Sequence, residues 1–259
     1  MTWQRTYRGW LLVWTIAGAL LFALFVALGT WQIERRAWKL DLIARVDQRV
    51  HAAPQPAPAP GEWGGINAEA DAYRHVSVRG TFMNERETLV QASTALGPGF
   101  WVLTPLRTDD GHYVLINRGY VPDNRRERNT RAATEPAGEQ TVTGLLRITE
   151  PHGGFLRSND AAANRWYSRD VAAMAAARDL PAGSVAPYFI DAESGGNADV
   201  DRWPVGGLTV VSFHNSHLVY VITWYTLALM VAGAVVYLWR LEGRRKASAR
   251  RHGQVDDEH

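Results

Sequence analysis

Two apolar stretches near the ends of the chain dominate its pattern of hydrophobic and polar positions. Trp10–Trp31 and Leu218–Trp239 each run for 22 residues without a charged side chain. An α-helix rises about 1.5 Å per residue, so each stretch reaches roughly 33 Å and can cross a bilayer core of about 30 Å. The pattern therefore predicts two transmembrane helices, 10–31 and 218–239, on either side of a polar segment.

The segment between them, 32–217, changes its periodicity along its length. Gln32–Val50 carries apolar residues at helical spacing and predicts a continuing or second helix. Alternating proline in residues 52–60 cannot continue a helix, which predicts a stiff, extended linker. From Tyr73 onward, short alternating runs between turn-forming residues predict the strands Tyr73–Thr81, Glu87–Ala92, Phe100–Leu106, His112–Val121, Gln140–Ile148, Trp166–Arg169, Ala186–Ile190 and Leu208–Phe213.

One alanine-rich run, about Val171 to Arg178, interrupts these strands and predicts a short helix. Many short strands with turns between them favour an antiparallel barrel or sandwich. The expected fold class is a membrane protein in which two transmembrane helices flank a β-rich, α+β extracytoplasmic domain.

Basic residues beside the two spans predict the topology. Arg5 and Arg8 precede the first span, and the second is followed by the larger cluster Arg240, Arg244, Arg245, Lys246, Arg250 and Arg251. Because lysine and arginine near membrane segments stay cytoplasmic, we expect the tails 1–9 and 240–259 to be cytoplasmic. Arg35, Arg36 and Lys39 follow the first span and argue against this. A cleavable signal peptide is an alternative for the first span, although the usual apolar run is only 7–15 residues.

Composition narrows the function. The chain has no cysteine, which excludes disulfides, iron–sulfur clusters and thiolate metal sites, and its four methionines are scattered. The segment between the spans is nearly neutral and has no basic footprint for nucleic acid. No nucleophile elbow or paired catalytic motif occurs, so we do not expect an enzyme.

A histidine stands at the start of the second span. On a helix, His217, Tyr220, Trp224 and Tyr225 share one face, which presents an imidazole at the membrane surface and an aromatic wall below it. Neutral imidazole is an axial ligand for haem iron, and an aromatic wall suits a flat hydrophobic cofactor. The alternative is an ordinary interfacial belt, because tryptophan and tyrosine gather at membrane surfaces in any case.

The end of the first span bears on the same place. In a helical hairpin, Gly29, Trp31 and Gln32 would lie beside His217; Gly29 permits close helix approach and Gln32 can form a hydrogen bond. Plain helix packing explains these residues equally well. His214 lies three residues before His217, but a two-histidine metal site needs helical geometry that the predicted strand Leu208–Phe213 disfavours.

Several strings of residues, in order along the chain, carry a family resemblance. They are Leu28-Gly29-Thr30-Trp31-Gln32-Ile33-Glu34-Arg35-Arg36, Phe100-Trp101-Val102-Leu103-Thr104-Pro105-Leu106, Val114-Leu115-Ile116-Asn117-Arg118-Gly119-Tyr120-Val121-Pro122, Ala186-Pro187-Tyr188-Phe189-Ile190-Asp191 and Asn215-Ser216-His217-Leu218-Val219-Tyr220 with Thr223-Trp224-Tyr225. In these strings the chain resembles the surfeit-locus-one family of cytochrome c oxidase assembly factors. The resemblance covers nearly the whole chain except the tails and the proline-rich segment.

The resemblance implies a role in building the haem a centres of cytochrome c oxidase in a bacterial inner membrane, with the central domain periplasmic. It implies haem a as the cofactor, with His217 as the axial ligand and the neighbouring aromatic residues around the haem. It also implies the catalytic subunit of the oxidase as a partner, and haem A synthase as a further partner. Arg35, Arg36 or Arg118 could contact the haem propionates, because arginine pairs well with carboxylates, and position favours Arg35. The alternative function is a haem-independent scaffold for oxidase assembly, in which Tyr220, Trp224 and Tyr225 are packing residues.

Overall fold

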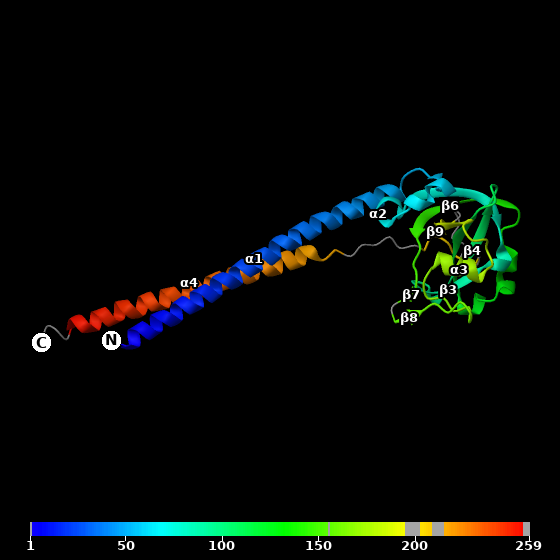
Figure 1. Cartoon of the computed structure of the whole chain (residues 1–259). Helices are drawn as coiled ribbons and strands as arrows, with labels where there is room; N and C mark the ends of the chain where they lie inside the picture. The colour runs from blue at the N-terminus through cyan, green and yellow to red at the C-terminus, as the bar shows by residue number, and fades with distance from the viewer. Residues whose placement is uncertain (1, 155, 195–202, 209–214, 256–259) are drawn as a thin grey trace. The chain divides into compact units, whose positions relative to one another are not determined.

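The computed structural model describes residues 2–154, 156–194, 203–208 and 215–255. Tertiary contacts divide the chain into two compact units, Met1–Ile43 with Phe213–His259, and Ala44–Ser212. The first unit is built from two long helices and the second is a β-rich domain (Figure 1). Two helices long and apolar enough to cross a membrane therefore flank a β-rich domain, which confirms the predicted fold class.

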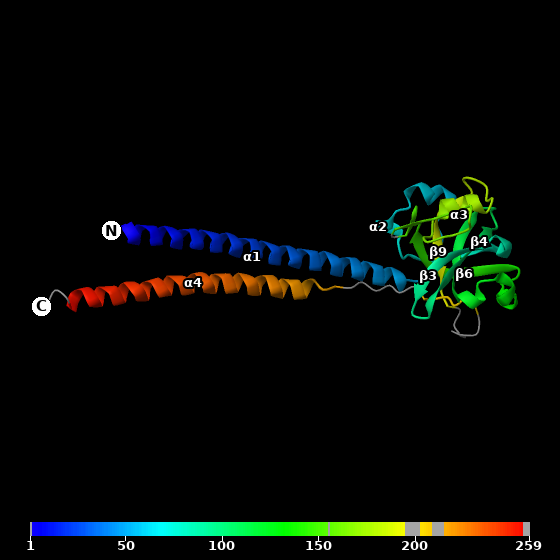
Figure 2. The ribbon, with the colours of Figure 1, turned by 90° about the horizontal axis from the view of Figure 1, so that it is seen from below.

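The helices of the first unit are α1 (Thr2–Val50), whose last residues belong to the β-rich unit, and α4 (His217–Val255). Figures 1 and 2 show them running side by side in opposite directions. Their large apolar side chains are mostly exposed, as a lipid-facing surface requires. Gln32–Val50 continues the first helix without a break.

The β-rich domain contains short helices as well as strands. Its α-helices and 3-10 helices are α2 (Ala68–Asp71), α3 (Val171–Ala177), η1 (Pro60–Gly65), η2 (Asn84–Arg86), η3 (Asp123–Arg125) and η4 (Arg128–Thr134). Its strands are β1 (Gln55–Pro56), β2 (His75–Phe82), β3 (Thr88–Thr94), β4 (Gly97–Thr108), β5 (Tyr113–Pro122), β6 (Glu139–Ile148), β7 (Gly153–Gly154), β8 (Arg157–Ser158) and β9 (Val185–Ala192).

The main sheet closes on itself. Its strand order is β1-β2-β6-β9-β5-β4-β3, and β2 also pairs with β4 from Gly80 opposite Thr108 to Phe82 opposite Leu106. Strands β2, β6, β9, β5 and β4 therefore form a five-stranded barrel, with β3 paired to β4 and β1 paired to β2 outside the ring. The prediction of an antiparallel sheet is wrong for two pairs of strands, β5 with β9 and β1 with β2, which are parallel. A long connection between the two strands of each pair permits this arrangement.

Alternation along the strands separates an inner and an outer core. Val114, Ile116, Tyr188 and Ile190 belong to one buried cluster with residues of β2, β4 and β6. The intervening Leu115 and Phe189 belong to a second cluster, which also holds Trp166 and residues of α3. Successive side chains of a strand point to opposite faces, so β5 and β9 serve both clusters. These two strands read as continuous apolar runs because both of their faces are buried.

The short helix predicted in this domain is present, whereas one of the predicted strands is not. The helix predicted at Val171–Arg178 is α3, and Asp170 accepts a hydrogen bond from the Ala173 N–H at its start (3.1 Å). The strand predicted at Trp166–Arg169 is wrong, because Trp166 makes only a single bridge to Val90 and packs its ring into the outer core. The strand predicted at Leu208–Phe213 lies almost wholly outside the described residues.

The proline-rich segment is extended, as predicted, but it is not a free linker. Gln55 and Pro56 pair with β2, and Ala57 packs against the inner core. The carbonyl oxygen of Pro58 accepts hydrogen bonds from the Tyr188 hydroxyl (2.9 Å) and from the Trp63 indole N–H (3.0 Å). The segment thus belongs to the barrel unit. Proline suits the edge of a sheet, because no further strand there requires the N–H donor that proline lacks.

Candidate functional site

Helices α1 and α4 approach each other closely along a seam of small residues. A Cβ on Gly18 would lie 2.4 Å from Val235 Cγ2, and a Cβ on Gly29 would lie 3.0 Å from the ring of Tyr225. At the far end of the seam the Trp239 indole N–H donates to Thr15 Oγ1 (3.0 Å). Small residues let helix backbones come together in a membrane, where helix contact depends on van der Waals packing.

The seam ends at a hydrogen bond between the two helices. His217, the first residue of α4, places its Nδ1 2.7 Å from Oε1 of Gln32 on α1. The Gln32 side chain is buried, with 9% of the residue exposed. Oε1 of an amide only accepts hydrogen bonds, so in this arrangement His217 Nδ1 is the donor. In a neutral imidazole the lone pair then lies on Nε2, which makes no hydrogen bond with any residue that the structure describes.

The start of α4 holds this histidine at a fixed point. Asn215 Oδ1 accepts a hydrogen bond from the His217 backbone N–H (3.3 Å), and the Ser216 carbonyl accepts from Val219 N–H (3.1 Å). A side-chain acceptor satisfies one of the N–H groups that a helix leaves unpaired in its first turn. The imidazole therefore projects from a capped helix end toward α1.

Trp224 and Tyr225 pack into the same helix pair. The Trp224 ring stacks on Phe25 at 5.8 Å between centroids, and the Tyr225 hydroxyl lies 3.2 Å from Thr30 Oγ1. Trp224 Nε1 is buried and has no hydrogen-bond partner in the described part of the chain. The structure thus gathers His217, Gln32, Trp224 and Tyr225 on the mutually facing sides of α1 and α4.

The other predicted site residues of these helices face outward. Tyr220 is 50% exposed and Trp31 is 51% exposed. Arg35 is also exposed, and its guanidinium lies 4.7 Å from the centroid of the Trp38 ring. Tyr220 lies on α4 one turn beyond His217, whereas Trp31 and Arg35 lie on α1 on either side of Gln32. These side chains are available to a ligand or to lipid headgroups.

Phe25 is the residue of this site that sequence reasoning missed. Its signal was present in the spacing Thr15, Gly18, Phe25, Gly29 and Gln32, whose intervals are sums of three and four residues. Such spacing marks the seam between two supercoiled helices. The long apolar run hides this seam, because nearly every neighbouring residue is apolar as well.

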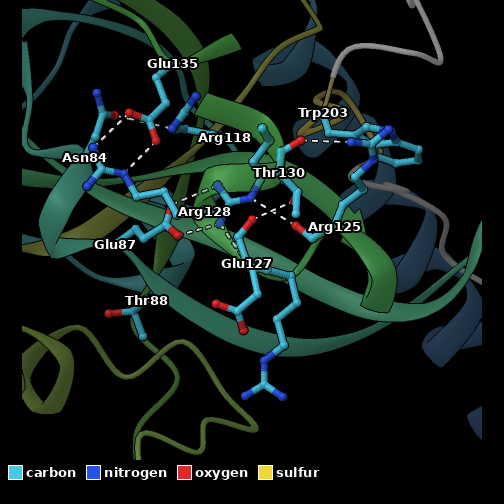
Figure 3. Close-up of polar contacts among 12 residues, drawn as sticks. Asn84, Glu87, Thr88, Arg118, Arg125, Glu127, Arg128, Thr130, Glu135 and Trp203 are labelled. Atoms are coloured by element: carbon cyan, nitrogen blue, oxygen red, sulfur yellow. Dashed lines mark hydrogen bonds and ion pairs between the residues drawn. The ribbon is translucent and has the colours of Figure 1, made fainter. Parts of the chain in front are cut away.

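Arg118, the alternative arginine for an anionic group, lies in the β-rich unit within a separate polar cluster (Figure 3). Its guanidinium makes two long hydrogen bonds, each 3.4 Å, to Asn84 Oδ1 and to the Thr134 carbonyl. No carboxylate among the described residues lies within ion-pair distance of it. The pKa of Arg118 is lowered to about 10, mainly by burial; the nearby charge of Glu87 opposes this lowering and that of Arg131 adds to it.

Two neighbouring arginines of this cluster, Arg131 and Arg128, each have a carboxylate partner. The buried Arg131, only 1% exposed at its side chain, forms a bidentate ion pair with Glu87. Arg128 donates to both carboxylate oxygens of Glu135, at 2.6 and 2.8 Å, and this hydrogen bonding lowers the pKa of Glu135. These pairs tie η4 to Glu87, just before β3, and to the chain that follows η4. They fasten the loop between β5 and β6 to the barrel.

A conventional metal site is not formed by the described part of the chain, where no group of three or more His, Asp or Glu side chains is placed to hold an ion. His214, the other histidine of the possible two-histidine metal site, lies outside the described residues. Among the described site residues, the group that remains able to bind a metal is the imidazole of His217. With Nδ1 bonded to an amide oxygen and Nε2 carrying a lone pair, His217 has the arrangement usual for a metal-binding histidine.

The chain has two apolar helices long enough to cross a membrane and, between them in the sequence, a five-stranded β-barrel domain. These features define the class of protein: a β-barrel domain flanked by two membrane-length helices. Within that class, the SURF1 family model matches residues 19–229. Surfeit locus protein 1 of Homo sapiens is 37% identical over 230 residues, covering 82% of this chain and 71% of the human protein. The chain therefore belongs to the SURF1 family, which confirms the resemblance seen in the sequence.

Other relatives agree with this assignment. Surfeit locus protein 1 of Rattus norvegicus is 36% identical over 240 residues, covering 84% of this chain and 73% of the rat protein. A SURF1-like protein of Caenorhabditis elegans is 30% identical over 241 residues, covering 84% of this chain and 72% of the nematode protein. Membership of this family supports a role in the assembly of cytochrome c oxidase.

Proposed function

We propose that the protein binds haem a through His217 and assists its insertion into the catalytic subunit of cytochrome c oxidase. The observation that carries the proposal is the hydrogen bond from His217 Nδ1–H to Gln32 Oε1 at the junction of two membrane-length helices. It leaves an imidazole nitrogen with a lone pair at the end of an apolar helix pair. Polar and ionisable groups at membrane depth are costly and usually functional.

The residues around His217 fit a large, flat, partly charged ligand. Haem supplies an iron that takes a neutral imidazole as axial ligand. The exposed rings of Tyr220 and Trp31, which lie near His217 and Gln32 along their helices, offer apolar surface, and Arg35 offers a guanidinium to propionates. The exposed apolar sides of α1 and α4 let the hydrocarbon tail of haem a stay in lipid. One protein ligand holds the cofactor while permitting its release, and no catalytic residue is required.

The proposed location follows from the charges beside the two helices. The basic clusters in the tails 1–9 and 240–259 favour cytoplasmic termini. The β-rich domain then lies on the periplasmic side of a bacterial inner membrane. The proposed partners are the catalytic subunit of cytochrome c oxidase, haem A synthase as the source of haem a, and membrane lipid. Nucleic acid is not a partner.

The test is the haem content of the full chain purified in detergent from a host that makes haem a. We expect an absorption spectrum of ligated haem, and pyridine extraction should identify haem a. His217→Ala should remove the haem. His112→Ala, which changes a histidine of the β-rich domain, is the matched control and should retain it. Full retention of haem by His217→Ala would refute the ligand assignment.

A second function, a haem-independent scaffold, is favoured by one specific observation. Trp224 stacks on Phe25, and Tyr225 packs against Gly29 and contacts Thr30, so both aromatic residues serve helix pairing. A scaffold would need this helix pair but not the imidazole. In that case His217→Ala would leave oxidase assembly in the host intact, whereas replacing α4 by an unrelated apolar helix would abolish it. Under the haem proposal both changes abolish assembly.

A further inference from the structure

We propose that Gln32 is the positioning residue of His217: it holds the imidazole in the Nδ1–H tautomer and so presents Nε2 as the metal-binding nitrogen. This inference rests on the proposed function and assigns Gln32 a different part from direct haem contact. Gln32 acts on the ligand through His217, from the opposite helix. The cofactor site is therefore completed by α1 and is not a property of α4 alone.

The geometry supports a tautomer lock. The Nδ1 to Oε1 distance of 2.7 Å is that of a short, well-formed hydrogen bond. Gln32 is buried, whereas His217 is only partly buried. The proton is therefore held on the inner, protected nitrogen. Metal-binding histidines are oriented in this way, since the hydrogen bond at one nitrogen decides which nitrogen binds the metal.

The position of Gln32 depends on helix pairing. Gly29 lies one turn before Gln32 on α1 and lets the backbone approach the ring of Tyr225. Residues three apart on a helix share a face, so this contact brings Gln32 toward α4 as well. Two separate features of α1, a glycine and an amide, thus converge on the same part of α4.

An amide differs from the carboxylate that often fills this role. A carboxylate draws the imidazole proton strongly, which makes the other nitrogen a stronger donor to the metal. The neutral amide orients the ring without adding charge at the membrane boundary, where charge is costly. Gln32 therefore gives His217 a fixed direction but only moderate basicity. That combination suits a protein that must give its ligand up.

The experiment compares Gln32→Leu and Gln32→Glu in the full chain in detergent, with Gln48→Leu as the matched control. Gln48 is an exposed glutamine of the same helix. The first measurement is haem-free: 15N chemical shifts of His217 report which ring nitrogen carries the proton. We expect Nδ1–H in the wild type, in Gln48→Leu and in Gln32→Glu. In Gln32→Leu we expect a shift toward Nε2–H.

The second measurement uses the same proteins loaded with haem a. We expect haem to dissociate about 10–100-fold faster from Gln32→Leu, the usual loss when such a partner is removed. The midpoint potential should rise in Gln32→Leu and fall in Gln32→Glu, because imidazole basicity changes in opposite directions. A merely structural role would not produce opposite shifts in two variants at one position.

The outcomes separate this inference from the proposed function. If Gln32→Leu leaves the tautomer, the dissociation rate and the potential at their wild-type values, Gln32 has no positioning role, although His217 can remain the ligand. If His217→Ala retains its haem, the proposed function fails. The 15N result then describes only the hydrogen bond between the two helices. Should Gln32→Leu separate the helices, Gln32→Glu, which keeps an acceptor, still decides the question through its potential.

Discussion

The two units of this chain use polar side chains in opposite ways. The β-rich domain holds many charged groups, and several of them are joined in ion pairs, such as Arg131–Glu87, Arg128–Glu135 and Arg147–Asp191. The membrane-length part of the helix pair holds few polar groups, and several meet across the helices, as do Gln32 with His217 and Thr30 with Tyr225. In the barrel unit polar contacts fasten loops to a core. In the helix pair they stand out against an apolar background.

This difference decides where function is sought. An exposed ion pair on the barrel has an ordinary structural explanation, and its contribution to stability is often small. An imidazole bonded to an amide between membrane-length helices also pairs the helices, but ionisable groups at membrane depth are costly and usually mark a function. Variants of the barrel therefore test a structural unit, and variants of the helix pair test the site.

The largest effect is expected from Gly119→Ala in the barrel. Gly119 has a φ of +130°, and an added Cβ would lie 2.2 Å from the Val205 carbonyl oxygen, which accepts a hydrogen bond from Tyr120 N–H. Strain and overlap should together lower the free energy of unfolding by more than about 3 kcal/mol. Thermal unfolding of the full chain in detergent, followed by near-ultraviolet circular dichroism, measures the loss.

The matched control for this change is Gly111→Ala. Gly111 also has a positive φ, +86°, but no atom lies within 4 Å of the added Cβ. It should cost only about 1–2 kcal/mol, the penalty of the left-handed backbone alone. Equal losses in the two variants would mean that the contact between Gly119 and Val205 is not tight in solution.

The next largest effect is expected from Arg131→Leu. The arginine is buried, and its removal leaves the carboxylate of Glu87 without its partner, which should cost about 3 kcal/mol. The control is Arg165→Leu, at an exposed pair with Asp160, where no resolvable change is expected. Urea unfolding of both variants gives the comparison. A harmless Arg131→Leu would show that the buried pair does not fasten η4.

A smaller but more specific effect tests the helix pair. The Cβ built on Gly18 lies 3.9 Å from Val235 Cβ, within the range for a disulfide. Because the chain has no cysteine, Gly18→Cys with Val235→Cys should form a single disulfide under mild oxidation. Gly18→Cys with Gly233→Cys should not, since no atom lies within 4 Å of a Cβ at Gly233. Proteolysis between the helices and gel electrophoresis measure the link, and equal linking of both pairs would exclude this seam.

The smallest effect is expected from pH. Hydrogen bonding from Arg128 lowers the pKa of Glu135. Burial would raise the pKa of Glu150, but the hydrogen bond and charge of Arg169 overcome it and lower that pKa. A lowered folded-state pKa stabilises the fold fully above the ordinary value of about 4.5, and the contribution is lost as pH falls through the folded-state pKa.

Barrel stability should therefore be level at neutral pH and fall below about pH 4.5, with Glu135 contributing no more than about 1 kcal/mol. Thermal unfolding as a function of pH measures this dependence. The variant Glu135→Gln should flatten part of the slope. A stability that rises on acidification through this range would contradict both assignments.

Much of the fold could be predicted from local sequence signals. Charge-free runs of 22 residues fix the membrane-length helices, and alternating residues fix most strands. The parallel pairing of β5 with β9 could not be predicted, because it depends on a long connection and not on either strand. Nor could the docking of Pro56 and Pro58, since proline composition specifies an extended backbone but not what it packs against.

The site was predicted in part for the same reason. His217 and Gln32 could be named because each is polar at the edge of an apolar run, where few residues compete for attention. Trp224 and Tyr225 could be placed on one helical face, but their packing against Phe25 and Gly29 depends on the register of two helices that are far apart in sequence. Arg118 has a local motif but no local sign that it would be half-buried without a carboxylate partner.

The central claim is that the imidazole at the start of α4 ligates haem iron. Resonance Raman spectroscopy of the ferrous, haem a-loaded full chain tests it most directly, with 15N-labelled histidine. We predict an iron–histidine stretching mode that shifts to lower frequency on labelling and is absent in His217→Ala. An unchanged iron–histidine mode in His217→Ala would assign the ligand to another histidine and contradict the account.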